Sequence, residues 1–130
     1  MPRFIEEAAG AVEARFAGAR VIAFGHLGDG NVHFNVRAPL GAGLAWLQSE
    51  APAVTSFVHD LVVAAGGSIS AEHGIGQMRL AELARLTDPA RLNAMRAIKA
   101  ALDPKGIMNP GKLVPRAGFA QSLAEEPVHP

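Results

Sequence analysis

Apolar, β-prone residues form two short arms, residues 21–27 and 31–38, on either side of Asp29 and Gly30. In the second arm every second residue is apolar, which is the period of a β-strand with one buried face. Asp-Gly is a preferred two-residue type I′ turn between antiparallel strands. The pattern therefore predicts a β-hairpin closed by Asp29-Gly30.

The two-residue turn predicts which residues face each other, and it places His26 directly opposite His33. Opposed residues share one face with Cβ atoms about 4.5–5.5 Å apart, a separation that suits two imidazoles on one metal ion. Asn31 and Asn35 flank His33 on the same face, and the apolar residues of the arm point the other way. The alternative is an ordinary hairpin whose histidines are partly exposed.

Apolar residues recur at helical spacing in four other stretches, which predicts helices there. Pro52 either breaks the second helix or marks a fresh start, and Gly66-Gly67 ends it. A short strand is expected at residues 68–70. The predicted helices span residues 4–17, 44–65, 78–86 and 89–102.

Composition limits the class of protein. The 130 residues suffice for one domain with one core, and 12 basic and 12 acidic side chains cancel. This balance argues against a nucleic-acid or membrane-surface partner, whereas a local metal or arginine can still bind a small anion. The absence of cysteine excludes disulfides and thiolate chemistry and fits a reducing compartment. With no recognisable leader and no apolar run near 20 residues, we expect a cytoplasmic protein without a membrane span.

A second informative segment follows the predicted strand and reads Ala71-Glu72-His73-Gly74-Ile75-Gly76. Glu72 is a candidate third ligand, since two imidazoles and one carboxylate suit zinc, iron or manganese. The alternative is that Glu72 caps the following helix or pairs with Arg79. His73 points away from Glu72 in an extended segment, and an imidazole beside a metal is a candidate general base.

Three motifs together resemble the C-terminal signatures of FAD-linked oxidases of the vanillyl-alcohol oxidase type. This family includes oxidases and dehydrogenases of D-lactate, glycolate and D-2-hydroxyglutarate. The resemblance covers residues 1–115, and any one motif alone is weak. The motifs are Gly25-His-Leu-Gly-Asp-Gly-Asn-Val-His33, Glu72-His-Gly-Ile-Gly76 and Leu102-Asp-Pro-Lys-Gly-Ile-Met-Asn-Pro-Gly-Lys112.

The resemblance implies an α+β fold, an antiparallel sheet packed with helices in part of a ferredoxin-like cap domain. It implies FAD and a divalent metal, with zinc the expected ion, as cofactors. The implied site residues are His26, His33 and Glu72 for the metal, His73 as catalytic base, Asn35 for substrate, and Asn31, Asn109 and Lys112 for the flavin cofactor.

The implied reaction oxidises a small D-2-hydroxy acid to the 2-oxo acid, with the hydride passing to a flavin. No Gly-rich dinucleotide-binding unit is recognisable, so we expect the FAD-binding domain to be absent and the isolated chain to be inactive. Two alternatives are a separate subunit that completes a flavin-binding chain in trans, and a non-catalytic metal-binding or interaction domain. We expect a flexible tail at residues 116–130 and an uncovered cap face that favours a homo-oligomer.

Overall fold

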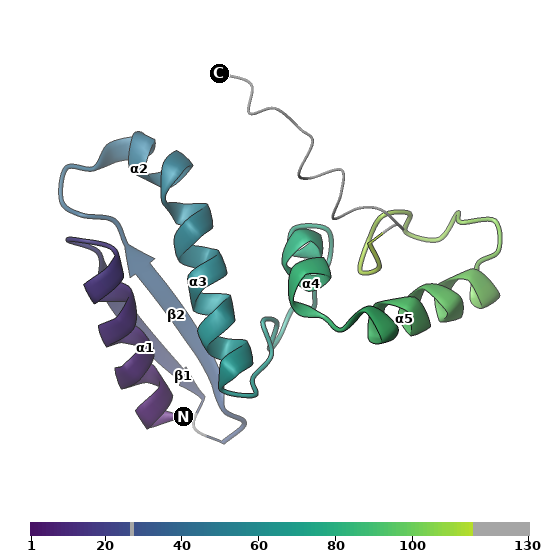
Figure 1. Ribbon diagram of the computed structural model, residues 1–130, viewed down its shortest axis with the longest axis horizontal. Coiled ribbons are helices and arrows are strands. Elements are labelled where there is room, and N and C mark those ends of the chain that lie inside the picture. Colours follow the sequence, from purple (N-terminus) through teal and green to yellow (C-terminus); the bar gives the residue numbers. More distant parts are fainter. Residues whose placement is uncertain (27, 116–130) are drawn as a thin grey trace. The chain divides into compact units, whose positions relative to one another are not determined.

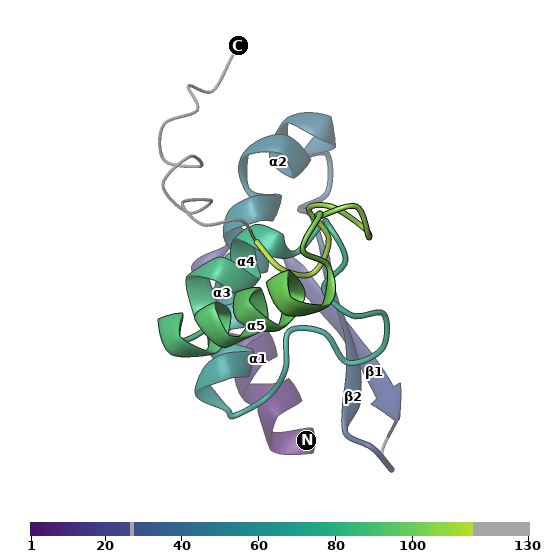
Figure 2. The same cartoon turned by 90° about the vertical axis from the view of Figure 1, so that its right-hand side faces the viewer.

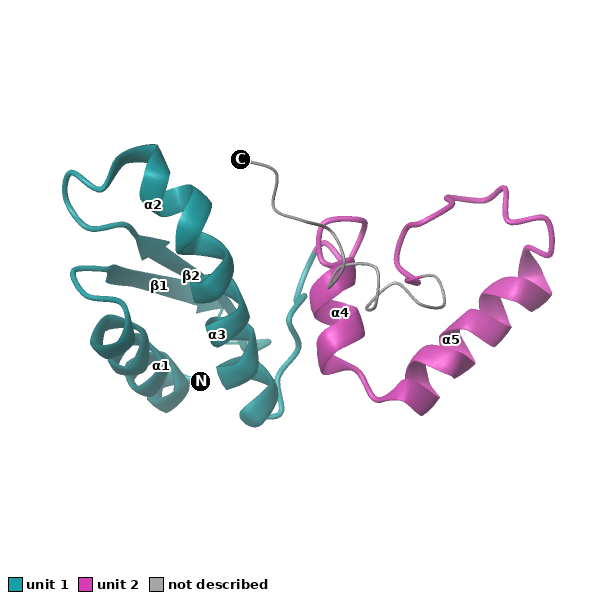
Figure 3. Ribbon diagram, turned by 45° about the horizontal axis from the view of Figure 1, so that its top comes forward, with its two compact units in different colours: residues 1–72 teal, residues 73–130 magenta. Residues whose placement is uncertain are grey.

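A computed structural model describes residues 1–26 and 28–115 of the chain, which forms two compact units, residues 1–72 and 73–130 (Figure 3). The expected flexible tail, residues 116–130, lies outside the described residues. Figure 1 labels the helices and strands. They are α1 (Pro2–Arg15), β1 (Arg20–His26), β2 (Asn31–Arg37), α2 (Gly43–Ser49), α3 (Ala51–Ala64), α4 (Leu80–Leu86) and α5 (Pro89–Leu102).

Unit 1 is a two-stranded antiparallel sheet with helices on one face (Figures 1 and 2). Helix α1 packs against β1 and α3. On β2, Phe34 and Val36 face α2 and α3 across a cavity of about 210 Å³ that Trp46 and Val58 also line. The buried apolar residues of this unit are Ala8, Val12, Ala19 and Val54.

The other face of the hairpin is open. Ile22 and Phe24 on β1 are 57% and 59% exposed, although both are large and apolar. His26 lies on the same face, because side chains two apart along a strand point the same way. The hairpin therefore separates an apolar face under the helices from an open face that carries the histidines.

The predicted hairpin is confirmed, but its register is wrong. His26 faces Asn31, and His33 faces Phe24. Four positions of the sequence separate the last residue of β1, His26, from the first residue of β2, Asn31. Gly30 N–H donates to the His26 carbonyl at 3.0 Å. Asp-Gly is compatible with a type I′ turn, so residue preference alone does not exclude the two-residue loop. In the structure the Asp29 side chain accepts from the Asn31 N–H at 3.0 Å, an Asx turn that closes the longer loop.

Two further predictions around α3 have different outcomes. Pro52 lies in the first turn of a new helix, as the fresh-start alternative expects. The strand predicted at residues 68–70 is wrong. The Ser68 hydroxyl donates to the Ser70 carbonyl at 3.1 Å and accepts from the Ser70 N–H at 3.2 Å. These local bonds use the N–H and the carbonyl of Ser70, which in a strand would bond to a neighbouring strand.

Unit 2 contains α4, α5 and the turns that follow them. Helix α5 begins as predicted, with Pro89 in its first turn and Asp88 at the N-cap, where the Asp88 carboxylate accepts from Ala90 N–H at 2.7 Å. The α+β prediction is confirmed, since the described residues form helices and a two-stranded antiparallel sheet. Among these residues no helix is long and apolar enough to cross a bilayer.

Candidate metal centre

The two histidines lie diagonally on the open face of the hairpin. His26 is the last residue of β1, and His33 is the third residue of β2. Their ring centroids are 5.8 Å apart and the rings are inclined by 69°. Diagonal neighbours on one face can still meet through long side chains. The predicted shared face is therefore correct, although the predicted direct opposition is not.

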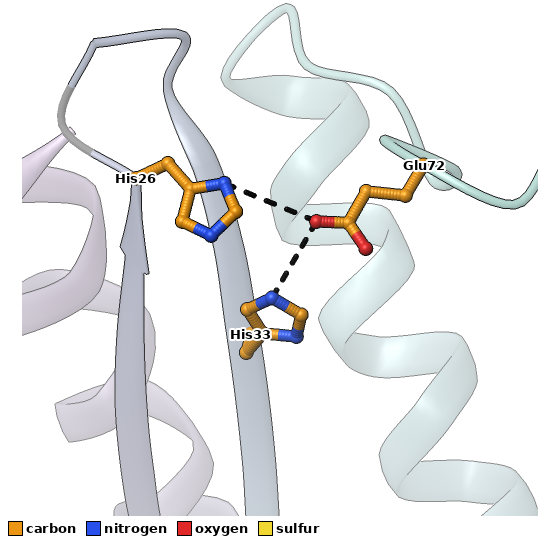
Figure 4. Close-up of side chains that lie close together, drawn as sticks. All are labelled: His26, His33 and Glu72. Carbon is orange, nitrogen blue, oxygen red and sulfur yellow. Dashed lines mark ion pairs between the residues drawn. The ribbon is translucent and has the colours of Figure 1, made fainter.

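Glu72 reaches the two histidines from the segment that follows α3 (Figure 4). One carboxylate oxygen, Oε1, lies 3.6 Å from His33 Nε2 and 4.0 Å from His26 Nδ1. The three side chains each offer a ligand atom, and these atoms all lie within 4.8 Å of one another. Residues that are about 40 positions apart in the sequence thus meet at one point.

The donor set fits a divalent metal. Ligand atoms bound to one zinc ion are about 3.3–3.5 Å apart, given bond lengths near 2.0–2.2 Å, and His33 Nε2 lies 3.6 Å from Glu72 Oε1. The side chains of His26, His33 and Glu72 are 58%, 40% and 35% exposed, respectively. Small side-chain rotations can therefore bring all three onto an ion that also keeps a position for water or substrate.

Asn31 and Asn35 occupy different environments, although both flank His33 on its face. Asn31 is 9% exposed, and its side-chain Nδ2 donates to Glu72 Oε1. Asn35 is exposed, and its Nδ2 donates to the Ile22 carbonyl at 3.4 Å. Asn31 is thus a partner of the carboxylate, whereas Asn35 lies beside His33 and its amide donates a long bond to backbone.

Sequence reasoning missed Phe24. Its ring stacks on His33, with centroids 5.0 Å apart and an interplanar angle of 18°, and this contact limits the orientations of the imidazole. The available signal was the period of two along β1, which puts Phe24 on the face of His26. Assigning its partner required the correct register.

The other predicted site residues, His73, Asn109 and Lys112, belong to unit 2 and are exposed. Asn109 has a positive φ of 45°, and its carbonyl accepts from Lys112 N–H at 3.2 Å. Asparagine tolerates this left-handed conformation better than most residues. The structure thus shapes residues 109–112 as a tight turn, and the roles of these three side chains stay predictions.

Asp103 organises the turns before Asn109. Its side chain is 5% exposed, and Lys99 Nζ donates to it at 2.6 Å. The carboxylate also accepts from the backbone N–H groups of Ile107 at 3.1 Å and Met108 at 2.9 Å. Lys99 additionally donates to the Met108 carbonyl. The sequence signal was a lysine four residues before an aspartate at the predicted helix end.

Acid is expected to weaken unit 2 through Asp103. The pKa of this carboxyl lies below its ordinary value of 3.8, chiefly because of the Lys99 hydrogen bond and also because of the Met108 and Ile107 N–H groups. A lowered folded-state pKa gives stability that is present above the unfolded pKa and is lost as pH falls through the folded pKa. Urea unfolding should therefore show a loss of stability below about pH 4.

The variant Asp103→Asn tests this assignment. We expect it to unfold at lower urea concentration than the wild type at pH 7, and to lose less stability between pH 5 and pH 3. Lys99→Met removes the largest cause of the low pKa, so its acid dependence should also be shallower. Equal acid dependence in the wild type and Asp103→Asn would contradict the role of this carboxylate.

Sequence comparisons match the chain to a C-terminal domain of FAD linked oxidases. Residues 1–113 match the family described as FAD linked oxidases, C-terminal domain. The chain is 37% identical over 113 residues to a D-2-hydroxyglutarate dehydrogenase of Stutzerimonas stutzeri, covering 87% of this chain and 24% of the relative. It is 42% identical over 95 residues to the mitochondrial D-2-hydroxyglutarate dehydrogenase of Bos taurus, covering 73% and 16%. It is 44% identical over 97 residues to a D-lactate dehydrogenase of Archaeoglobus fulgidus, covering 75% and 20%. The chain thus spans a quarter or less of these relatives.

Proposed function

The chain belongs to the family of FAD linked oxidases, C-terminal domain, and from this premise we propose that it binds the metal and substrate of an FAD-dependent dehydrogenase. The proposed reaction converts a D-2-hydroxy acid to the 2-oxo acid. Relatives named for D-2-hydroxyglutarate and D-lactate support this substrate class. The observation that carries the proposal is the meeting of His26, His33 and Glu72 at one point.

In this proposal, His26, His33 and Glu72 hold a divalent metal, with zinc as the preferred ion. Two imidazoles and a carboxylate form a ligand set that catalytic zinc sites use, and it leaves a position for substrate. A metal held by these three residues would supply Lewis acidity toward the hydroxyl of a substrate. The exposed fractions of the three side chains support access by a small anionic substrate.

In the proposed reaction, different groups accept the proton and the hydride of the substrate. His73 directly follows Glu72 in the chain, and we assign it as the base that takes the hydroxyl proton. A bound flavin supplies the acceptor for the hydride from Cα. Asn35 is assigned to substrate binding, because its exposed amide lies two residues from His33 on the same strand face.

The exposed apolar side chains on the open face of the hairpin suit the binding of a partner that carries the flavin. Ile22 and Phe24 are more than half exposed on the face of the candidate metal site. Large apolar side chains grouped beside a functional site are typical of a surface that another domain covers. We assign this face to a flavin-binding domain, with a second copy of the chain as the other possible occupant.

A chimera tests the catalytic assignment. Residues 1–113 would replace the matching segment of the Stutzerimonas relative, and flavin reduction by D-2-hydroxyglutarate and D-lactate would be followed by stopped flow. We expect the chimera to reduce its flavin with at least one of these acids. The variant His73→Ala should lower the rate by about 10²–10⁴-fold and keep its metal content.

The control is His59→Ala, since His59 lies on α3 and is not among the three clustered ligands. This variant should keep both the rate and the metal. A chimera that binds metal and flavin but oxidises neither acid would contradict the proposed reaction. An unchanged rate in His73→Ala would contradict the assignment of the base.

A further inference from the structure

Asn31 makes a contact that its predicted role toward the flavin does not explain. Its Nδ2 donates to Glu72 Oε1, the same oxygen that lies near both histidines. Asn31 is buried, whereas both histidines are 40% exposed or more. The amide thus contacts the carboxylate and is largely shielded from solvent.

The backbone fixes the position of Asn31 independently of Glu72. Asn31 is the first residue of β2 and pairs with His26 across the ladder. Its N–H is also held by the Asp29 side chain at 3.0 Å. Because these bonds anchor the backbone, the side-chain amide starts from a defined point next to the end of β1.

Glu72 has no such anchor from regular secondary structure. It lies eight residues beyond the end of α3, in a segment that forms neither helix nor strand. A glutamate side chain has several rotamers, and fixing one of them costs conformational entropy. A donor on a fixed strand can select the rotamer that places Oε1 beside the histidines.

We propose that Asn31 is a positioning residue that orients Glu72 Oε1 toward His26 and His33 and thereby raises the affinity of the site for a divalent metal. This inference rests on the proposed function, since it presumes that the three side chains bind metal. Outer partners that hold a metal ligand by a hydrogen bond contribute in this way, and losing one costs about 10–100-fold in affinity.

The chain provides a matched comparison in Asn35. Both asparagines lie on β2, two residues from His33 and on the same face. The two amides differ in their partners. The Asn31 amide donates to Glu72, and the Asn35 amide donates to the Ile22 carbonyl. The two substitutions to alanine therefore remove the same chemical group from the same strand face, with and without the contact to the carboxylate.

The experiment measures Zn²⁺ affinity of the full 130-residue chain by competition with a chromophoric chelator, without substrate or flavin. Asn31→Ala should weaken binding by about 10–100-fold, and Asn35→Ala should stay within about twofold of the wild type. The absorption bands of bound Co²⁺ should also change in Asn31→Ala, because the carboxylate no longer has a fixed orientation.

A double-mutant cycle separates positioning from damage to the hairpin. If Asn31 acts through Glu72, then adding Asn31→Ala to Glu72→Ala should leave the residual affinity of the two histidines unchanged. If Asn31→Ala instead disrupts the strand, it should weaken that residual binding as well, and this result would overturn the inference. Asn31→Ser is the second variant, used if far-UV circular dichroism shows that Asn31→Ala is unfolded.

The outcomes also separate this inference from the function on which it rests. A wild-type chain that binds no Zn²⁺, Mn²⁺ or Fe²⁺ contradicts the metal site itself. A wild-type chain that binds Zn²⁺ and loses it in His33→Ala, but keeps it fully in Asn31→Ala, contradicts only the positioning role.

Discussion

Replacing His33 with alanine is expected to weaken Zn²⁺ binding by more than about 100-fold. This exceeds the effect of losing an outer partner, about 10–100-fold, because His33 is one of only three proposed protein ligands. Its Nε2 also makes the shorter of the two histidine approaches to Glu72 Oε1, 3.6 Å. Competition with a chromophoric chelator would measure the change, and Glu72→Ala should behave in the same way.

Thermal unfolding gives a second measure of the same loss. A ligand that binds only the folded state at 100 times its dissociation constant adds about 2.7 kcal/mol. For a chain of this size that corresponds to a rise in Tm of roughly 5–15 °C. The wild type should show this rise with Zn²⁺, and His33→Ala should not. The control His59→Ala should keep it, and a full rise in both variants would contradict the assigned ligands.

Gly25→Ala is expected to have the largest effect on the stability of unit 1. A Cβ at Gly25 would lie 2.0 Å from the Asn31 carbonyl oxygen and 3.0 Å from Val32 Cα. These are backbone atoms of the paired strand, so the clash cannot be relieved by rotating a side chain. Overpacking a well-packed site costs about 1–3 kcal/mol and occasionally more, and we expect about 3 kcal/mol here.

The displacement should also reach the metal site, because Asn31 is the residue that must move. We therefore expect Gly25→Ala to lower both the urea midpoint and the Zn²⁺ affinity. Gly28→Ala is the matched control from the same hairpin, since a Cβ there meets no atom within 4 Å, and its stability should change by less than about 1 kcal/mol. Equal midpoints for the two variants would contradict the close approach of β2 to Gly25.

Local patterns were good predictors of the elements. Proline in the first turn and an aspartate before it marked the start of α5, and two glycines marked the end of α3, where Gly67 N–H bonds to the Val62 carbonyl at 2.8 Å. These signals depend on backbone chemistry within a few residues, so they can be read without knowing the fold. The wrong strand at residues 68–70 shows their limit, since serine side chains can bond to their own backbone instead.

Local patterns did not predict the register of the hairpin. Asp-Gly is compatible with a two-residue turn, but here the Asp29 carboxylate accepts the Asn31 N–H and four positions of the sequence separate the two strands. Both registers keep His26 and His33 on one face, because the residue count of the loop changes by two. The shared face was therefore predictable, and the diagonal geometry was not.

Sequence alone predicted the hairpin and the helical stretches, the ligand chemistry available to the chain and the family it resembles, because each of these is encoded in short stretches of residues. Tertiary structure decided how they combine. Glu72 meets His26 and His33 only after the chain has passed through α2 and α3 and returned to the hairpin. The contact of Asn31 with Glu72 spans 41 residues. Such contacts depend on how the helices pack on the sheet, and no local pattern specifies that packing.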